Sequence, residues 1–213
     1  MADATALLRL TTWLSPAFPT GGFAWSGGLE AACRDGRVAD SDGLRAWCET
    51  LLLHGSLHND AVLLKSVLED ELPAGEADAL ARALATSPER LDEMVEQGRA
   101  FAQAAAPWVP DLGNQHALPV AIALACRAAG IAGSDALVAF LNAAIGQQVQ
   151  AAQRLAPIGQ RVAMGVLAAL EPAILAAADR AAQSSLADLG GFAPMLDMAA
   201  MNHAALDSRI FRS

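Results

Sequence analysis

Basic residues are scarce in this sequence of 213 residues, and tyrosine is missing altogether. Only 14 residues are Lys or Arg, of which a single one, Lys65, is lysine, against 23 Asp and Glu, so the formal net charge is −9. A protein that binds nucleic acid needs a basic face. The charge balance therefore argues against a nucleic-acid partner.

Long apolar runs are also lacking. The longest uncharged apolar run, residues 117–126, spans 10 residues, whereas a membrane-spanning helix needs about 20. Asp3 and Arg9 lie in the first 14 residues, which does not suit a signal peptide. The sequence holds three widely spaced cysteines: Cys33, Cys48 and Cys126. They are expected as small buried residues in a reducing compartment, so we expect a cytoplasmic protein without a membrane segment.

Signatures of common enzymes are absent as well. Residues 22–27 have the glycine spacing of a phosphate-binding loop, but Gly28 and Leu29 follow where that loop needs lysine and a hydroxyl residue. No G-x-S-x-G motif occurs. His54 and His58 are four residues apart, which predicts one shared helix face. Without a third ligand, solvent-facing or partner-facing histidines are favoured over a metal site. We therefore predict no enzyme, no catalytic residue, and no metal or cofactor bound directly.

The remaining pattern is helical. Apolar residues recur with the period of an α-helix, and no alternating run bounded by turns predicts a strand. Capping signals predict three helix starts: at Asp40 or Ser41, at Ser87-Pro88 and at Ser134-Asp135. Pro157 and Gly159 are expected to separate two helices, and Glu171-Pro172 to begin another. We predict an all-α fold over residues 1–213, a single domain of about ten helices in an irregular bundle interrupted by Pro and Gly.

Residues 14–30 differ from the rest and read LSPAFPTGGFAWSGGLE. The prolines fix φ, and the glycines permit positive φ or a close backbone approach. Phe18, Phe23 and Trp25 then either fill the core or form a contact surface, and the core is the commoner place. Glu30 stands one residue too late for a capping box. Its carboxylate is expected to favour a helix start or to meet a partner's Arg or Lys.

Two further stretches are unusual. Residues 154–160, RLAPIGQ, are either a plain helix junction or a presented pair of Arg154 and Gln160. Residues 208–213, SRIFRS, give an acidic protein a basic and aromatic end. Docking of this end, on the chain itself or on a partner, is favoured over fraying. His203, near a helix end, is expected to satisfy terminal backbone groups.

These stretches carry a resemblance to a known family. Residues 15–30 resemble the N-terminal motif of the urease accessory protein F (UreF) family, and residues 154–160 are similar to its basic-Leu-x-Pro-Leu/Ile-Gly-Gln segment. Residues 195–213 resemble its C-terminal signature, and residues 116–130 match more weakly. Departures include Trp25, where the family usually has tyrosine. The resemblance implies an all-α, non-catalytic assembly factor that tends to form a homodimer.

The resemblance also implies partners. The family binds urease accessory protein D (also called H) and the GTPase urease accessory protein G, and acts on apo-urease as nickel enters. Nickel is then delivered by the complex. Residues 207–213 are expected to form a tail that docks on the D/H protein, while Glu30 and Arg154 contact the GTPase or shape that surface. The predicted partner-binding residues are Pro19, Gly21, Gly22, Phe23, Trp25, Ser26, Gly28, Glu30, Arg154, Pro157, Gly159, Gln160, Arg209, Phe211 and Arg212.

Three alternatives of other classes stand beside this interpretation. A GTPase-activating regulator would use Arg154 or Arg209 as an arginine finger. A nickel-binding chaperone would use His54 and His58. An all-α enzyme would hold a buried metal or haem.

Overall fold

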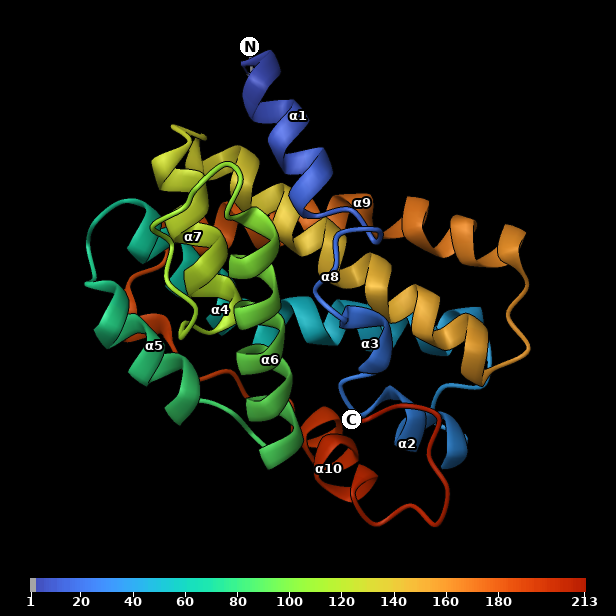
Figure 1. The fold of residues 1–213 in the computed structure, drawn as a ribbon. Coiled ribbons are helices and arrows are strands. Elements are labelled where there is room, and N and C mark those ends of the chain that lie inside the picture. The colour runs from blue at the N-terminus through green and yellow to red at the C-terminus, as the bar shows by residue number, and fades with distance from the viewer. Residues whose placement is uncertain (1–2) are drawn as a thin grey trace.

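The computed structural model describes residues 3–213 and has an all-α fold, as the sequence predicts (Figure 1). Within these residues there are ten α-helices and no strand. The helices are α1 (Ala4–Trp13), α2 (Leu29–Arg34), α3 (Ser41–Leu53), α4 (Ser56–Leu68), α5 (Ala74–Ala83), α6 (Pro88–Ala105), α7 (Leu118–Ala128), α8 (Gly133–Leu155), α9 (Gln160–Gln183) and α10 (Pro194–His203). Two short 3-10 turns, η1 (Gly22–Ala24) and η2 (Leu186–Asp188), lie between them.

Helix α4 forms the centre of the bundle. Every residue from Leu57 to Val67 is buried, and the helix packs against α3, α7, α8 and α9. The only lysine, Lys65, lies on this helix and pairs with Glu71 at 2.7 Å at its exposed end. Because α4 is surrounded on all sides, its side chains Asn59, Asp60 and Lys65 pair with groups of the protein.

Two of the three predicted helix starts follow their local sequence signals. The Asp40 carboxylate accepts the Gly43 N–H at 2.9 Å at the start of α3, and the Ser87 hydroxyl accepts the Arg90 N–H at 3.1 Å at the start of α6. The predicted start at Ser134-Asp135 is wrong, because α8 begins at Gly133 with Ala132 as its cap.

The predicted break at Glu171-Pro172 is wrong as well. Helix α9 continues through Pro172, which is exposed and whose ring points away from the packed side. The missing N–H leaves one carbonyl unpaired on the solvent side, where water can satisfy it. Leu170 and Ile174 on the opposite side are buried against the bundle, and this packing favours a helix that continues through the proline.

By length and composition, α9 is the one helix among residues 3–213 that is able to cross a membrane. Here it packs along α8 and α3. The expectation of no membrane segment stays a prediction.

Candidate partner-binding site

The C-terminal tail (residues 207–213) docks on its own chain. The Arg212 N–H donates to the Ala24 carbonyl at 2.8 Å, and the Ser26 N–H donates to the Ser213 carbonyl at 2.9 Å. The Gly27 N–H donates to the Ser213 hydroxyl at 3.2 Å. In Figure 1 the C-terminus accordingly lies beside the loop that precedes α2. The tail and the N-terminal loop (residues 14–30) therefore form one structural unit.

Glu30 holds this unit together from inside. Its side chain is fully buried in the first turn of α2. The carboxylate accepts the N–H groups of Ile210 and Phe211, each at 2.9 Å, and faces the His203 ring at 3.2 Å. Burial raises the pKa of Glu30, but the two backbone donors and His203 outweigh it, so the pKa lies below its usual range. The Arg34 guanidinium also lies 3.2 Å from the carboxylate, so the cation and the hydrogen-bond donors that Glu30 meets belong to its own chain.

His203 bridges two carboxylates. The side chain is fully buried on α10, with Nε2 facing Glu30 and Nδ1 2.9 Å from a Glu89 oxygen. Both ring nitrogens therefore lie within hydrogen-bonding distance of a carboxylate oxygen. Glu89 also pairs with Arg209 at 2.8 Å. The expectation that His203 satisfies terminal backbone groups is therefore wrong: it links α2, α6, α10 and the tail.

Two arginines cover the aromatic residues of the unit. The Arg154 guanidinium lies 4.1 Å above the Phe211 ring and donates to the Phe23 carbonyl at 2.7 Å. Arg212 lies 4.3 Å above the Trp25 ring. Such cation–π contacts stabilise by roughly 0.5–1 kcal/mol each at exposed sites. They bring residues 23–25, the α8–α9 junction and the tail together.

The aromatic residues of the N-terminal loop have different surroundings. Trp25 is buried, as the core interpretation predicts, and half-buried Phe18 packs on Phe101 at 5.5 Å between ring centroids. Phe23 is 77% exposed, so the core interpretation is wrong for this residue. Phe23 lies inside the short 3-10 turn of residues 22–24, whereas Trp25 follows that turn with an extended backbone.

The predicted partner-binding residues divide into three groups by exposure. Five are buried: Trp25, Ser26, Gly28, Glu30 and Phe211. Gly21 and Gly22 are half-buried. Eight are exposed: Pro19, Phe23, Arg154, Pro157, Gly159, Gln160, Arg209 and Arg212. In this structure the buried members shape the surface rather than form it, and contact with a partner stays a prediction for all fifteen.

The α8–α9 junction does not present Arg154 and Gln160 as a pair. Arg154 turns to the N-terminal loop, whereas the Gln160 side chain accepts a hydrogen bond from Gln153 at 2.9 Å. Ile158 between them is buried and anchors the junction. Arg154 alone therefore joins the unit formed by the loop and the tail.

Gly28 allows α10 to approach α2. It has φ +86°, and a Cβ at this position would lie 2.6 Å from the Ala200 nitrogen. We expect Gly28→Ala to lower the free energy of unfolding by about 2–4 kcal/mol, from backbone strain and from the clash with α10. Gly21→Ala is the control, because Gly21 has φ +77° but nothing near it. Denaturant unfolding of both variants separates the cost of backbone strain from the cost of the clash. Equal losses in the free energy of unfolding would show that the clash with α10 contributes nothing.

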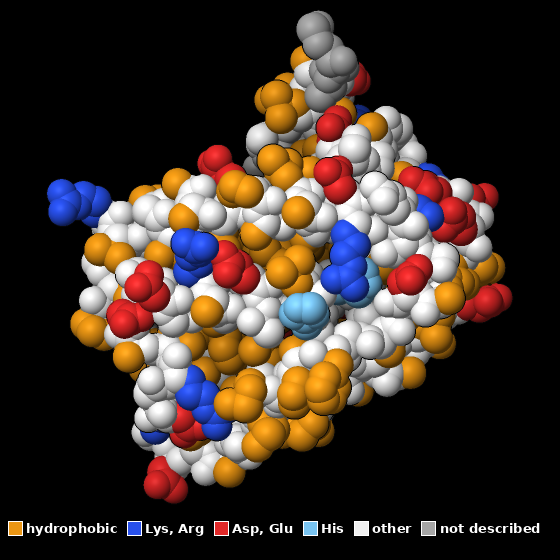
Figure 2. Space-filling model, turned by 180° about the vertical axis from the view of Figure 1, so that it is seen from behind, with side chains coloured by type: hydrophobic (Ala, Val, Ile, Leu, Met, Phe, Trp, Pro, Cys, Tyr) orange, Lys and Arg blue, Asp and Glu red, His pale blue; other side chains and the backbone are white. Residues whose placement is uncertain are grey.

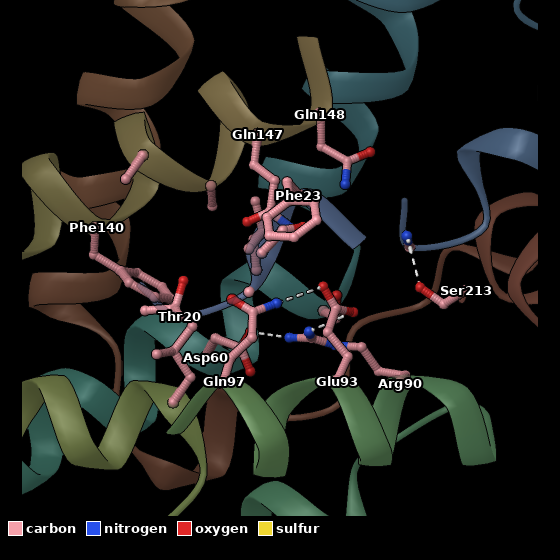
Figure 3. Close-up of a pocket in the computed structure, with 18 of the residues that line it drawn as sticks. Thr20, Phe23, Asp60, Arg90, Glu93, Gln97, Phe140, Gln147, Gln148 and Ser213 are labelled. Atoms are coloured by element: carbon pink, nitrogen blue, oxygen red, sulfur yellow. Dashed lines mark hydrogen bonds and ion pairs between the residues drawn. The ribbon is translucent and has the colours of Figure 1, made fainter. Parts of the chain in front are cut away.

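A cavity of about 420 Å³ lies beneath the N-terminal loop (Figure 3). Arg90 on α6 forms ion pairs there with Asp60 and, at 3.0 Å, with Glu93. Gln97 donates to Glu93 at 3.1 Å, and Gln147, which also lines the cavity, donates to the Gly22 carbonyl at 2.9 Å. Burial raises the pKa of Asp60. Burial lowers the pKa of Arg90, but the two carboxylates outweigh it and raise that pKa.

Sequence reasoning missed this ionic cluster. A signal for it was present, because Asp60 interrupts an apolar helix whose far end holds Lys65, and Arg90 and Glu93 are three residues apart on one helix. Nothing in the sequence pairs Asp60 with Arg90, which comes 30 residues later.

The predicted shared helix face of His54 and His58 is wrong. His54 ends α3, Gly55 separates the helices, and His58 belongs to α4. The His58 ring lies 3.2 Å from the Asp188 carbonyl, and burial lowers its pKa. Within residues 3–213 no group of three or more His, Cys, Asp and Glu is placed to hold a metal ion.

Comparison with known proteins finds one family and several close relatives over nearly the full chain. The UreF family profile matches residues 38–171. The chain is 49% identical to the urease accessory protein UreF of Mesorhizobium japonicum, over 98% of this chain and 96% of that protein. It is 47% identical to UreF of Agrobacterium fabrum, with the same coverage, and 46% identical to UreF of Sinorhizobium medicae, over 100% and 98%.

Proposed function

Because this chain belongs to the UreF family of urease accessory proteins, we propose that it is a non-catalytic scaffold for urease maturation. It joins accessory protein D/H and the GTPase accessory protein G to apo-urease in the cytoplasm. Nickel is delivered by that complex and is not held by a site in this chain. The scaffold works as a homodimer.

The observation that carries this proposal is the meeting of three distant segments on one surface. The N-terminal loop, the α8–α9 junction and the tail converge where Arg154 contacts Phe23 and Phe211. A partner that docks there touches all three. We assign the exposed tail residues Arg209 and Arg212 to the D/H protein, and Phe23 with Arg154 to the GTPase.

Phe23 gives the sharpest test of this surface. It is 77% exposed, so its removal costs the fold little, whereas a large aromatic at the centre of an interface is a typical hot spot. We expect Phe23→Ala to weaken capture of the GTPase by the complex with the D/H protein by roughly 10- to 30-fold. The measurement is co-purification of the three proteins, followed by titration of the GTPase.

Phe192→Ala is the matched control, because Phe192 is 80% exposed in the loop before α10 and outside this surface. Equal capture by wild type and Phe23→Ala would remove Phe23 from the interface. Failure of the wild-type chain to bind either partner would overturn the scaffold proposal itself.

The alternative of a GTPase-activating regulator receives less support. Arg154 is held by Phe23 and Phe211, and Arg209 by Glu89. An arginine finger has to reach a neighbour's nucleotide, so either side chain would first have to leave these contacts. The nickel-chaperone alternative is weaker still, because His54 and His58 lie on different helices.

A further inference from the structure

The cavity beneath the N-terminal loop has the size and the lining of a small-molecule site. Its volume of about 420 Å³ lies within the range of roughly 300–1,000 Å³ that such sites occupy. The rings of Phe18, Phe101 and Phe140 line it, together with polar side chains from α4, α6 and α8. Figure 3 shows Gln97 on one side of the cavity and Phe140 and Gln147 on the other. A molecule inside it meets both apolar rings and polar groups.

Negative charge exceeds positive charge in this lining. Three carboxylates line the cavity, those of Asp60, Glu93 and Asp197, whereas Arg90 is the only Lys or Arg among its described lining residues. Burial raises the pKa of Asp60 and that of Asp197, so water and nearby cations compensate neither charge in full. On the surface seen from behind, by contrast, several basic side chains lie next to acidic ones (Figure 2). The cavity therefore favours a positively charged ligand.

Two amide oxygens in the cavity are free to accept hydrogen bonds. Gln97 is 3% exposed, and its nitrogen donates to Glu93 while its oxygen accepts no hydrogen bond within residues 3–213. The Gln147 nitrogen donates to the Gly22 carbonyl, and its oxygen is likewise free within these residues. Both oxygens lie beside Gly22, because a Cβ there would be 3.4 Å from Gln97 Oε1 and 2.8 Å from Gln147 Oε1. A buried acceptor without a donor costs free energy, which a ligand with N–H groups recovers.

An organic ammonium ion fits this lining better than a metal ion does. A calcium ion takes six to eight oxygen ligands, but within residues 3–213 no three His, Cys, Asp or Glu side chains are placed to hold a metal. Aromatic rings attract organic cations through their faces. The three N–H donors of an ammonium group match the two amide oxygens and the Glu93 carboxylate beside Gln97.

We propose that this cavity binds a small organic amine in its protonated form. The ammonium group donates to the Gln97 and Gln147 oxygens and to the Glu93 carboxylate. The apolar part of the amine packs on the aromatic rings of the cavity. The inference goes beyond the proposed function and does not rest on it.

Calorimetric titration of the full chain with 2-phenylethylamine at neutral pH tests the proposal. We expect a dissociation constant below about 1 mM. The uncharged analogue 2-phenylethanol has nearly the same size and is expected to bind at least about 10-fold more weakly, because it lacks the charge. Gln97→Leu removes a free oxygen and is expected to weaken binding of the amine by about 10-fold or more. Gln153→Leu is the matched control, because Gln153 lies on α8 outside the cavity and donates to Gln160.

A second variant tests the location of the amine. Ala144 on α8 is half-buried and lines the cavity, so Ala144→Phe fills the space and is expected to abolish binding. Urea unfolding establishes that each variant is folded. The proposal is overturned if the amine does not bind at roughly 5 mM, if 2-phenylethanol binds equally well, or if folded Ala144→Phe or Gln97→Leu binds like the wild type. Displacement of the amine by Ca²⁺ at about 1 mM would assign the cavity to a metal ion instead.

Discussion

Arg90→Met is expected to lower the free energy of unfolding by about 3–5 kcal/mol, among the largest losses that a single substitution causes in this protein. Among residues 3–213, Arg90 is the only cation that forms an ion pair with Asp60 and Glu93, whose side chains are each 7% exposed. Methionine keeps the volume but leaves two carboxylates buried without a counter-charge. Urea unfolding followed by circular dichroism measures the loss.

The pH dependence of this variant provides an internal check. Burial already raises the pKa of Asp60 in the wild type, against the lowering by Arg90. Without the guanidinium, the pKa of Asp60 rises further. A carboxyl group with a raised pKa in the folded state destabilises the fold where it is ionised. The deficit of Arg90→Met is therefore expected to shrink as the pH falls.

Arg45→Met is the control for charge removal as such. Arg45 pairs with Glu49 at 2.8 Å on the outer side of α3, with 53% and 35% of the two side chains exposed. Exposed pairs of this kind stabilise by less than about 1 kcal/mol. If Arg90→Met lowers the free energy of unfolding by no more than Arg45→Met does, the cavity does not isolate its charges from water.

The sequence predicts features whose two partners are close together in the chain, and it does not predict features that depend on packing between distant segments. The starts of α3 and α6 follow from Asp40 and Ser87, because a cap and its N–H partner are three residues apart. The continuity of α9 does not follow, since the exposure of Pro172 depends on which side the bundle covers. Local rules describe the chain well only where both partners lie within one turn of helix.

In the candidate site, too, the sequence does not show which distant segments lie together. The resemblance identifies the loop, the junction and the tail as special, but not that they meet. Phe23 and Trp25 are two residues apart and look equivalent in sequence, yet one is exposed and the other buried. Glu30 and His203 are separated by 173 positions. Their pairing depends on how α10 packs on α2, and no pattern of spacing within one segment encodes it.

Glu30→Gln is expected to release the tail while the helices stay folded. Glutamine keeps the size of the side chain but replaces one acceptor oxygen with a donor, which then faces the N–H groups of Ile210 and Phe211 or the His203 ring. Loss of a buried, charge-assisted network of this kind costs roughly 2–3 kcal/mol. Hydrogen exchange of the Ile210 and Phe211 amides is therefore expected to accelerate by about 30-fold or more.

The pH dependence of tail docking follows from the pKa of Glu30. That pKa lies below its usual range in the folded chain because backbone donors and His203 favour the ionised carboxylate over the effect of burial. The resulting stabilisation is present above the unfolded pKa of about 4.3 and is lost as the pH falls through the lower folded value. Wild-type tail protection is therefore expected to disappear in acid below about pH 4, whereas in Glu30→Gln the protection is low at every pH.

Glu96→Gln separates this inner contact from an outer one. Glu96 also binds the tail, by accepting from Arg212 at 2.8 Å, but its side chain is 48% exposed and water can replace the lost pair. In Glu96→Gln we expect the Ile210 and Phe211 amides to exchange at rates close to those of the wild type. If the Ile210 and Phe211 amides exchange at the same rate in Glu30→Gln and in Glu96→Gln, the buried carboxylate does not hold the tail. If only Glu30→Gln releases it, a single inward-facing residue controls the surface that the tail presents to a partner.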